Sequence, residues 1–288
     1  MTPTDDWLTA FLAAERLPAS YAQTIEAVAA PLAQQIAGRV EQAGALVVGV
    51  CGAQASGKST LTAVVKRLLE IRGLKVALFS LDDIYLTRAE RQALAAEVHP
   101  LLATRGVPGT HDVAWGEALL EDLRKPGQTL LPAFDKASDD RKPGAVFEGP
   151  ADVVLFEGWC VGAAPQGPSA LAQPINDLER YLDPGGVWRT YANAALAGPY
   201  RDLFSRLGML VLLQAPGFEV VLDWRIEQER KLRERLTREG GDVSRVMSDD
   251  QVEAFIRHYE RLTRWILEEM PRRADIVVRL DKQRRASL

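Results

Sequence analysis

The sequence predicts an α/β fold in which a parallel sheet is flanked by helices. Several short apolar runs are rich in β-branched residues and lack polar alternation, which is typical of strands buried on both faces. One such run is followed by glycines, a helical segment and a second run, and this strand–helix–strand order places the two strands parallel. The chain has 288 residues, of which 47% are hydrophobic, so it can bury the core of one large domain.

Two amphipathic helices are expected ahead of the first strand. Apolar residues recur at helical spacing over 7–12 and again over 25–40, and Pro18 separates the two segments. We therefore expect an N-terminal helical extension over 1–44, followed by the main domain over 45–288.

The main domain is expected to begin with a strand at 45–51, a helix at 59–71 that Gly73 ends, and a second strand at 74–81. Further buried strands are expected at 152–158, 209–215 and 275–280. Between these strands, the segments 105–110 and 133–150 are rich in Gly, Pro and polar residues and predict irregular structure. Long irregular segments inside a compact domain often carry function.

Two charged helices are expected at 218–239 and 252–269. The first contains three acid-first i,i+4 pairs, which is typical of a solvated helix, namely Glu227–Lys231, Glu229–Arg233 and Glu234–Arg238. Arg225 and Arg230 fall outside these pairs. One or both could act from a helical lid over about 218–245 and stabilise a transferring phosphate, or the helix could simply face solvent.

Composition excludes several classes of protein. The net charge of −4 offers no basic field for nucleic acid or an anionic membrane. The two cysteines, Cys51 and Cys160, stand in apolar runs and predict buried thiols without a disulfide framework. No apolar run approaches the 18 residues of a membrane span, and the acidic N-terminus does not resemble a signal peptide. A cytoplasmic protein is expected, with no nucleic-acid partner and no membrane partner.

The segment "GAQASGKST" has the spacing G-x-x-x-x-G-K-[ST] between a predicted strand and a predicted helix. Glycines at these positions let backbone N–H groups surround a phosphate, and the positive end of the helix adds to the attraction. Lys58 can reach the β- and γ-phosphates, and the Ser59 hydroxyl can bind Mg²⁺. The predicted nucleotide-binding residues are Gly52, Ala53, Gln54, Ala55, Ser56, Gly57, Lys58, Ser59 and Thr60.

Acidic residues follow two of the buried strands. Glu157 ends one strand and is expected to bind Mg²⁺, directly or through water, unless it is a solvated cap. Asp82 and Asp83 follow another strand, where either could take a proton from an acceptor hydroxyl or could act as a turn or helix cap. A guanine-specific switch normally carries an Asn-Lys-x-Asp segment that recognises the base. This class is disfavoured, because the only asparagines are Asn176 and Asn193 and neither is followed by Lys.

Six segments together resemble the D-glycerate 3-kinase family, which belongs with phosphoribulokinase, uridine kinase and bacterial pantothenate kinase among the P-loop kinases. These segments are "GAQASGKST", "SLDDIYLT", "HPLLATRGVPGTHDV", "LPAFDKASDDR", "DVVLFEGWCVG" and "WRIEQERKL". The resemblance extends over about 49–280. It implies a P-loop NTPase-type sheet and the use of ATP and Mg²⁺.

The resemblance also implies roles for single residues. It makes Asp82 the general base, lets Asp83 touch the metal or hold its loop, and agrees with Glu157 as a metal ligand. Arg225 is the simplest match to the lid arginine, with Arg230 second.

The substrate that the resemblance implies is D-glycerate, phosphorylated at its 3-hydroxyl. Its carboxylate requires a fixed cation, best an Arg, with polar groups for the hydroxyls. The candidate substrate residues are Asp83, Tyr85, Arg105, His111, Lys136, Arg141 and Arg189. The alternatives are a P-loop kinase for pantothenate or a nucleoside, and a regulatory ATP-binding protein that never transfers phosphate. The sequence does not determine the oligomeric state.

Overall fold

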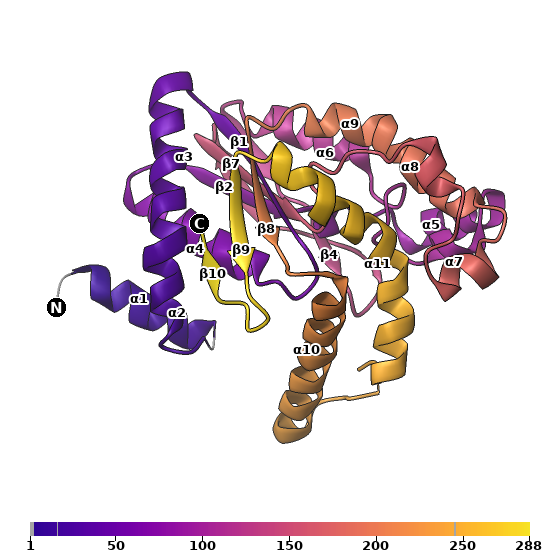
Figure 1. The fold of residues 1–288 in the computed structure, drawn as a ribbon. Coiled ribbons are helices and arrows are strands. Elements are labelled where there is room, and N and C mark those ends of the chain that lie inside the picture. The colour runs from indigo at the N-terminus through magenta and orange to yellow at the C-terminus, as the bar shows by residue number, and fades with distance from the viewer. Residues whose placement is uncertain (1–2, 16, 245) are drawn as a thin grey trace.

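The computed structural model describes residues 3–15, 17–244 and 246–288, which are built around a central sheet covered by helices on both faces (Figure 1). Within the described residues the sheet has six strands in the order β10-β9-β8-β1-β7-β2, of which only β10 runs antiparallel to its neighbour. The strands are β1 (Leu46–Gly52), β2 (Val76–Ser80), β7 (Val153–Gly158), β8 (Met209–Gln214), β9 (Ile276–Leu280) and β10 (Ala286–Ser287).

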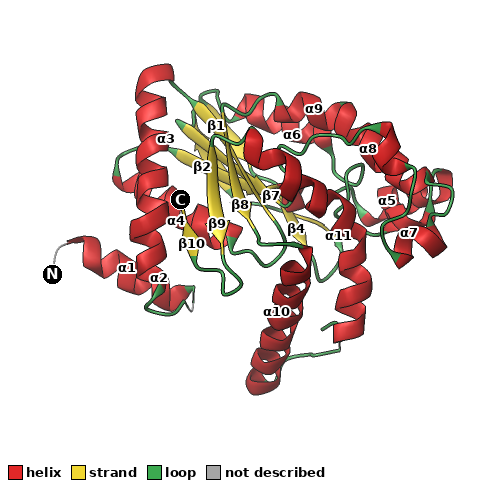
Figure 2. Ribbon diagram, in the orientation of Figure 1, coloured by secondary structure: helices red, strands yellow, loops and turns green. Residues whose placement is uncertain are grey.

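The helices form two layers. Helices α3 and α4 lie on one side of the sheet, and α6, α8 and α9 lie on the other, while α10 projects from the body beside α11 (Figures 1 and 2). The helices are α1 (Pro3–Ala14), α2 (Tyr21–Thr24), α3 (Ala30–Ala43), α4 (Lys58–Ile71), α5 (Arg88–Glu97), α6 (Val113–Asp122), α7 (Asp177–Leu182), α8 (Val187–Ala197), α9 (Pro199–Phe204), α10 (Phe218–Glu239) and α11 (Asp249–Glu269).

The predicted buried strands and charged helices are confirmed, with ends that differ by three residues or fewer. The expected irregular structure over 105–110 is also confirmed. The same expectation for 133–150 is wrong. That segment contains β4 (Ala133–Asp135), β5 (Asp140–Lys142) and β6 (Val146–Gly149). β4 pairs with β5 in a hairpin, and β6 pairs with β3 (Gly127–Leu130). These strands have three or four residues each, too few for a periodic pattern to show.

The helices that precede β1 share the core of the sheet. α3 packs against α4 and β1, and its residues Leu32 and Ile36 are buried there. Arg39 of the same helix donates to Gly208 O at 3.0 Å and to Asp275 Oδ1 at 2.7 Å, which ties α3 to the opposite half of the sheet.

Both cysteines, Cys51 and Cys160, are buried and unpaired, as predicted. Among the described residues, no helix has the combination of length and apolar character that crossing a membrane requires.

The strand register sets the location of the polar residues. Glu157 on β7 stands opposite Val50 on β1 and opposite Ser80 on β2. The three strands therefore end at one edge of the sheet. The residues that follow them, including Asp82, are brought to the same edge although they come from distant parts of the chain.

Candidate active site

The loop between β1 and α4 has the backbone of a phosphate cradle. Ala55 and Gly57 adopt left-handed conformations, with φ of 59° and 86°. Among the residues that the structure describes, no side chain caps the first turn of α4, so its N–H groups can bind an anion. Gly52 is required for packing, because a Cβ there would lie 2.9 Å from Ser56 Oγ and 3.1 Å from Leu213 Cβ.

Lys58, Ser59 and Glu157 converge beside this loop. Ser59 Oγ donates to Glu157 Oε1 at 2.8 Å, and Lys58 Nζ lies 3.7 Å from Glu157 Oε2. Burial opposes the charge of Lys58, but the negative charges of Glu157 and Asp82 outweigh it and raise the pKa of the ammonium. Lys58 therefore stays protonated in the range where phosphates are anionic.

The Ser59–Glu157 pair has the chemistry of a Mg²⁺ site. Glu157 is only 6% exposed, so it is not the solvated cap that the sequence left open. Its Oε2 is buried and receives no hydrogen bond from the described part of the chain. Hydroxyl and carboxylate oxygens are ligands that Mg²⁺ prefers. The described residues contain no group of three or more His, Cys, Asp or Glu side chains that could hold a metal ion. Such a group is not required here, because phosphates and waters complete the coordination of Mg²⁺ in sites of this kind.

Asp82 lies in a short 3₁₀ helix, Leu81–Ile84, that directly follows β2. Tyr85 Oη donates to Asp82 Oδ1 at 2.6 Å, and Lys136 Nζ donates to Oδ2 at 2.6 Å. Burial disfavours the charged form of Asp82. The charges of Lys136 and Lys58 and the two hydrogen bonds outweigh it and hold the pKa of Asp82 well below its usual range. The carboxylate of Asp82 is therefore ionised in this arrangement.

Asp83 has a different location. Its Oδ2 accepts the N–H of Ser80 at 2.9 Å and completes a capping box, so Asp83 holds the loop that presents Asp82. Burial raises the pKa of Asp83 to about 6, against the lowering effect of that hydrogen bond. Asp82 is the acid that accepts a hydrogen bond from Lys136, and the charge of Lys58 also favours its ionised form.

Three of the predicted substrate residues lie in or beside the β4–β5 hairpin. Lys136 is in the turn of the β4–β5 hairpin, and Arg141 on β5 donates to Tyr85 O at 2.9 Å and to Asp112 Oδ2 at 3.0 Å. Arg105 forms an ion pair with Asp139 in the same hairpin turn. The hairpin therefore brings positive charge to the edge of the sheet where Asp82 lies.

His111 is buried and packs against Tyr85. Its ring stacks on Tyr85 with centroids 4.7 Å apart, and its Nδ1 lies 2.6 Å from Tyr200 Oη. Burial lowers the pKa of His111 to about 3, so the imidazole is neutral and serves as packing and a hydrogen-bond partner.

Tyr259 on α11 was not among the sequence-predicted site residues. Its hydroxyl donates to Arg105 O at 2.9 Å, and its ring packs against Trp159 with centroids 4.9 Å apart. Burial raises the pKa of Tyr259 and the negative charge of Asp82 raises it further, while the charges of Arg105 and Arg225 lower it. In the sequence Tyr259 belongs to the apolar face of a helix, and no local signal distinguishes it from a core residue.

The two lid arginines differ in their surroundings. Arg225 forms an ion pair with Glu229 at 2.5 Å, and both side chains are largely buried. This corrects the expectation that Arg225 has no i,i+4 partner and that Glu229 pairs with Arg233. Arg230 pairs with Asp249 on α11, and both side chains are exposed. Of these two arginines of α10, Arg225 is the one whose side chain is largely buried.

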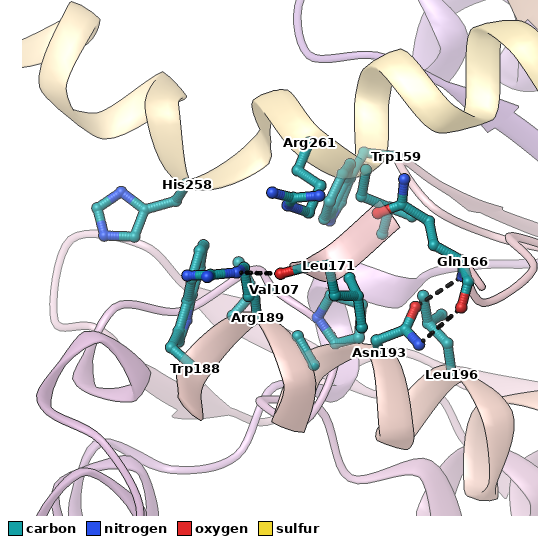
Figure 3. Close-up of a pocket in the computed structure, with 13 residues that line it drawn as sticks. Val107, Trp159, Gln166, Leu171, Trp188, Arg189, Asn193, Leu196, His258 and Arg261 are labelled. Atoms are coloured by element: carbon teal, nitrogen blue, oxygen red, sulfur yellow. Dashed lines mark hydrogen bonds between the residues drawn. The ribbon is translucent and has the colours of Figure 1, made fainter. Parts of the chain in front are cut away.

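Arg189 does not join the other predicted substrate residues. It lines a small cavity of about 40 Å³ between α8 and α11, together with Trp188, Trp159 and Arg261 (Figure 3). Its guanidinium is engaged by Asp183 Oδ2 at 2.9 Å and by Leu171 O at 2.8 Å. Both members of this ion pair are almost fully buried, so Arg189 is engaged inside the fold and is not available to a substrate.

Comparison with known proteins places the chain among kinases. No family model matches it. The uncharacterized kinase mug58 of Schizosaccharomyces pombe is 32% identical over 225 residues, which cover 74% of this chain and 78% of that kinase. The chain belongs to this P-loop kinase family. The chloroplastic D-glycerate 3-kinase of Arabidopsis thaliana is 30% identical over 236 residues, and the chain spans 46% of the length of that relative.

A solved structure agrees with this placement. The D-glycerate 3-kinase from Cryptococcus neoformans var. grubii superposes with a TM-score of 0.73 over 93% of this chain and 98% of that one, at 27% identity. The predicted resemblance to D-glycerate 3-kinase is confirmed, and so is the P-loop kinase fold. The protein is an ATP-using kinase that transfers a phosphoryl group to an alcohol.

Proposed function

We propose that this kinase phosphorylates D-glycerate at its 3-hydroxyl, with Mg²⁺-ATP as the donor. The observation that carries the proposal is the alignment of β2, β7 and β1. Because these strands end at one edge of the sheet, Asp82 follows β2 at the edge where Lys58, Ser59 and Glu157 lie, and this supports the proposal. The relatives named D-glycerate 3-kinase support the choice of acceptor.

Each residue then has a defined role. The loop before α4 and Lys58 hold the triphosphate, and Ser59 with Glu157 would hold Mg²⁺, which neutralises charge on the β- and γ-phosphates. The 3-hydroxyl oxygen of glycerate attacks the γ-phosphorus, its proton passes to Asp82, and the bond from that phosphorus to the β–γ bridging oxygen breaks to release ADP. Arg225 covers the charge that develops on the transferring group. Most of the acceleration comes from positioning and electrostatics.

Cations in and beside the hairpin support an anionic acceptor. Lys136 binds Asp82 and Arg141 binds the Tyr85 carbonyl, so the carboxylate of a small hydroxy acid beside Asp82 would meet positive charge. Arg105 adds a further cation beside the hairpin turn. These cations would give a neutral acceptor such as a nucleoside no charge–charge attraction.

The test is an ADP-release assay with D-glycerate, L-glycerate, pantothenate and uridine as separate acceptors. Turnover is expected with D-glycerate. The product should be consumed by 3-phosphoglycerate kinase coupled to glyceraldehyde-3-phosphate dehydrogenase, which 2-phosphoglycerate would not support. Preferential turnover of pantothenate or uridine, or no acceptor-dependent ADP release with D-glycerate, would disprove the proposal.

A further inference from the structure

The two donors that bind Asp82 differ in their freedom to move. Tyr85 is 3% exposed and is packed between His111 and Phe134, with ring centroids 4.7 and 5.1 Å away. The Lys136 side chain is 61% exposed and extends from the turn of the β4–β5 hairpin. A lysine on a flexible stem can exchange one partner for another at little cost, whereas the buried tyrosine cannot.

Lys136 also differs from the nearby arginines in its ion-pair partner, which is Asp82, the proposed base. Arg105 pairs with Asp139, Arg141 with Asp112, and Arg225 with Glu229. Each of these guanidiniums is matched by an acid that has no part in the transfer. An incoming carboxylate would compete with those fixed pairs, but it could take Lys136 from Asp82 and leave Asp82 available for the proton.

We propose that Lys136 binds the carboxylate of the acceptor, and that the move of its ammonium from Asp82 Oδ2 to that carboxylate activates Asp82 as the base. This rests on the proposed function and deepens it, because it defines the substrate class as small hydroxy acids. The only covalent change remains the phosphoryl transfer, and the hydroxyl proton ends on the Asp82 oxygen that Lys136 has left.

The same contact restrains the enzyme when no acceptor is bound. With Lys136 in place, Asp82 is a weak base, since the neighbouring ammonium stabilises its ionised form. Water in the open site is then a poor nucleophile towards the γ-phosphate. A neutral analogue of the substrate, such as glycerol, offers the same hydroxyl without displacing Lys136, so the structure predicts selectivity for the acid over the neutral polyol.

The experiment compares wild type with Lys136→Gln and Lys136→Arg, and with Lys142→Gln as the matched control. Lys142 is exposed on β5 of the same hairpin. The measurements are KM and kcat for D-glycerate and for glycerol, ADP release without an acceptor, and the pH profile of kcat/KM. Thermal unfolding midpoints verify that all variants are folded.

For Lys136→Gln we expect the KM for D-glycerate to rise about tenfold to a hundredfold, from the loss of one charge-assisted hydrogen bond. The preference for D-glycerate over glycerol should fall by a similar factor. Acceptor-independent ADP release should increase, and the acidic limb of the pH profile should move to higher pH. Lys136→Arg should retain most of the preference, and Lys142→Gln should behave as wild type.

An unchanged preference for D-glycerate over glycerol in Lys136→Gln, together with unchanged acceptor-independent ADP release, would overturn the inference. Failure of the proposed function looks different, because wild type itself would then not turn over D-glycerate. In that case the ADP release of Lys136→Gln relative to wild type and Lys142→Gln still decides whether Lys136 restrains Asp82.

Discussion

Replacement of Asp82 by asparagine separates base catalysis from nucleotide binding. The asparagine side chain is nearly isosteric with the aspartate, so its amide oxygen can still accept the Tyr85 hydroxyl that now lies 2.6 Å from Asp82 Oδ1. The amide can no longer take a proton from the acceptor. Loss of a positioned general base typically costs about 10²- to 10⁴-fold in rate, or roughly 3 to 5 kcal/mol of transition-state stabilisation.

The donor site should survive this change. Lys58 keeps its ion pair with Glu157, at 3.7 Å, and Ser59 keeps its hydrogen bond to the same carboxylate. We therefore expect the affinity of Asp82→Asn for ATP, measured with a fluorescent analogue, to stay within a few-fold of wild type. The kcat for D-glycerate, measured by ADP release, should fall by two to four orders of magnitude.

Asp83→Asn is the matched control for this experiment. The neighbouring amide can still accept the N–H of Ser80, which Asp83 Oδ2 binds at 2.9 Å, so the loop keeps its cap. Transfer by Asp83→Asn should remain within a few-fold of wild type. If Asp82→Asn also kept its kcat within about threefold of wild type, Asp82 would not be the base.

Three further predictions concern the charged groups around this centre. Lys58→Ala should weaken ATP binding by about tenfold or more, because charge-assisted phosphate contacts are lost, and it should also lower kcat. Measurements of ATP binding and of turnover that show only one of these two effects would contradict this prediction. Arg225→Gln should lower kcat by about 10²-fold with nearly unchanged ATP affinity, whereas the exposed Arg230→Gln should have little effect, and equal losses would refute the assignment of the lid arginine. Burial raises the pKa of Asp83 to about 6 from an ordinary 3.8, so the folded protein binds the carboxyl proton of Asp83 more tightly than the unfolded chain does. The stability that Asp83 contributes therefore falls as pH rises from about 4 to about 6. The unfolding midpoint of Asp83→Asn relative to wild type should therefore be higher at pH 7 than at pH 4, and thermal melts at the two pH values test the sign.

The half of the site that binds the nucleotide was predictable from the sequence, because the residues that form it are neighbours in the chain. The loop from Gly52 to Thr60 is contiguous, and its glycine spacing, its preceding strand and its following helix are all visible in neighbouring residues. Continuous apolar runs also indicated parallel strands. Since parallel strands end at one sheet edge, the proximity of Glu157 and Asp82 to that loop followed from the strand pattern.

The acceptor half depended on contacts between distant residues. From the sequence, four cations were equally good candidates to bind the substrate carboxylate, namely Arg105, Lys136, Arg141 and Arg189. The β4–β5 hairpin, which is too short to be predicted, turns Lys136 onto Asp82, although 54 residues separate them in the chain.

The sequence by itself determined that this protein has a phosphate loop, a buried parallel sheet and acids at the strand ends. Local spacing and periodicity encode each of these features. Only the tertiary structure decided which charged groups remain available to a substrate. Asp183 engages Arg189 inside the fold, and Tyr259 turns one hydroxyl of an apolar helix face toward Arg105. A side chain's availability depends on which partner the fold brings to it, and that partner can lie anywhere in the chain.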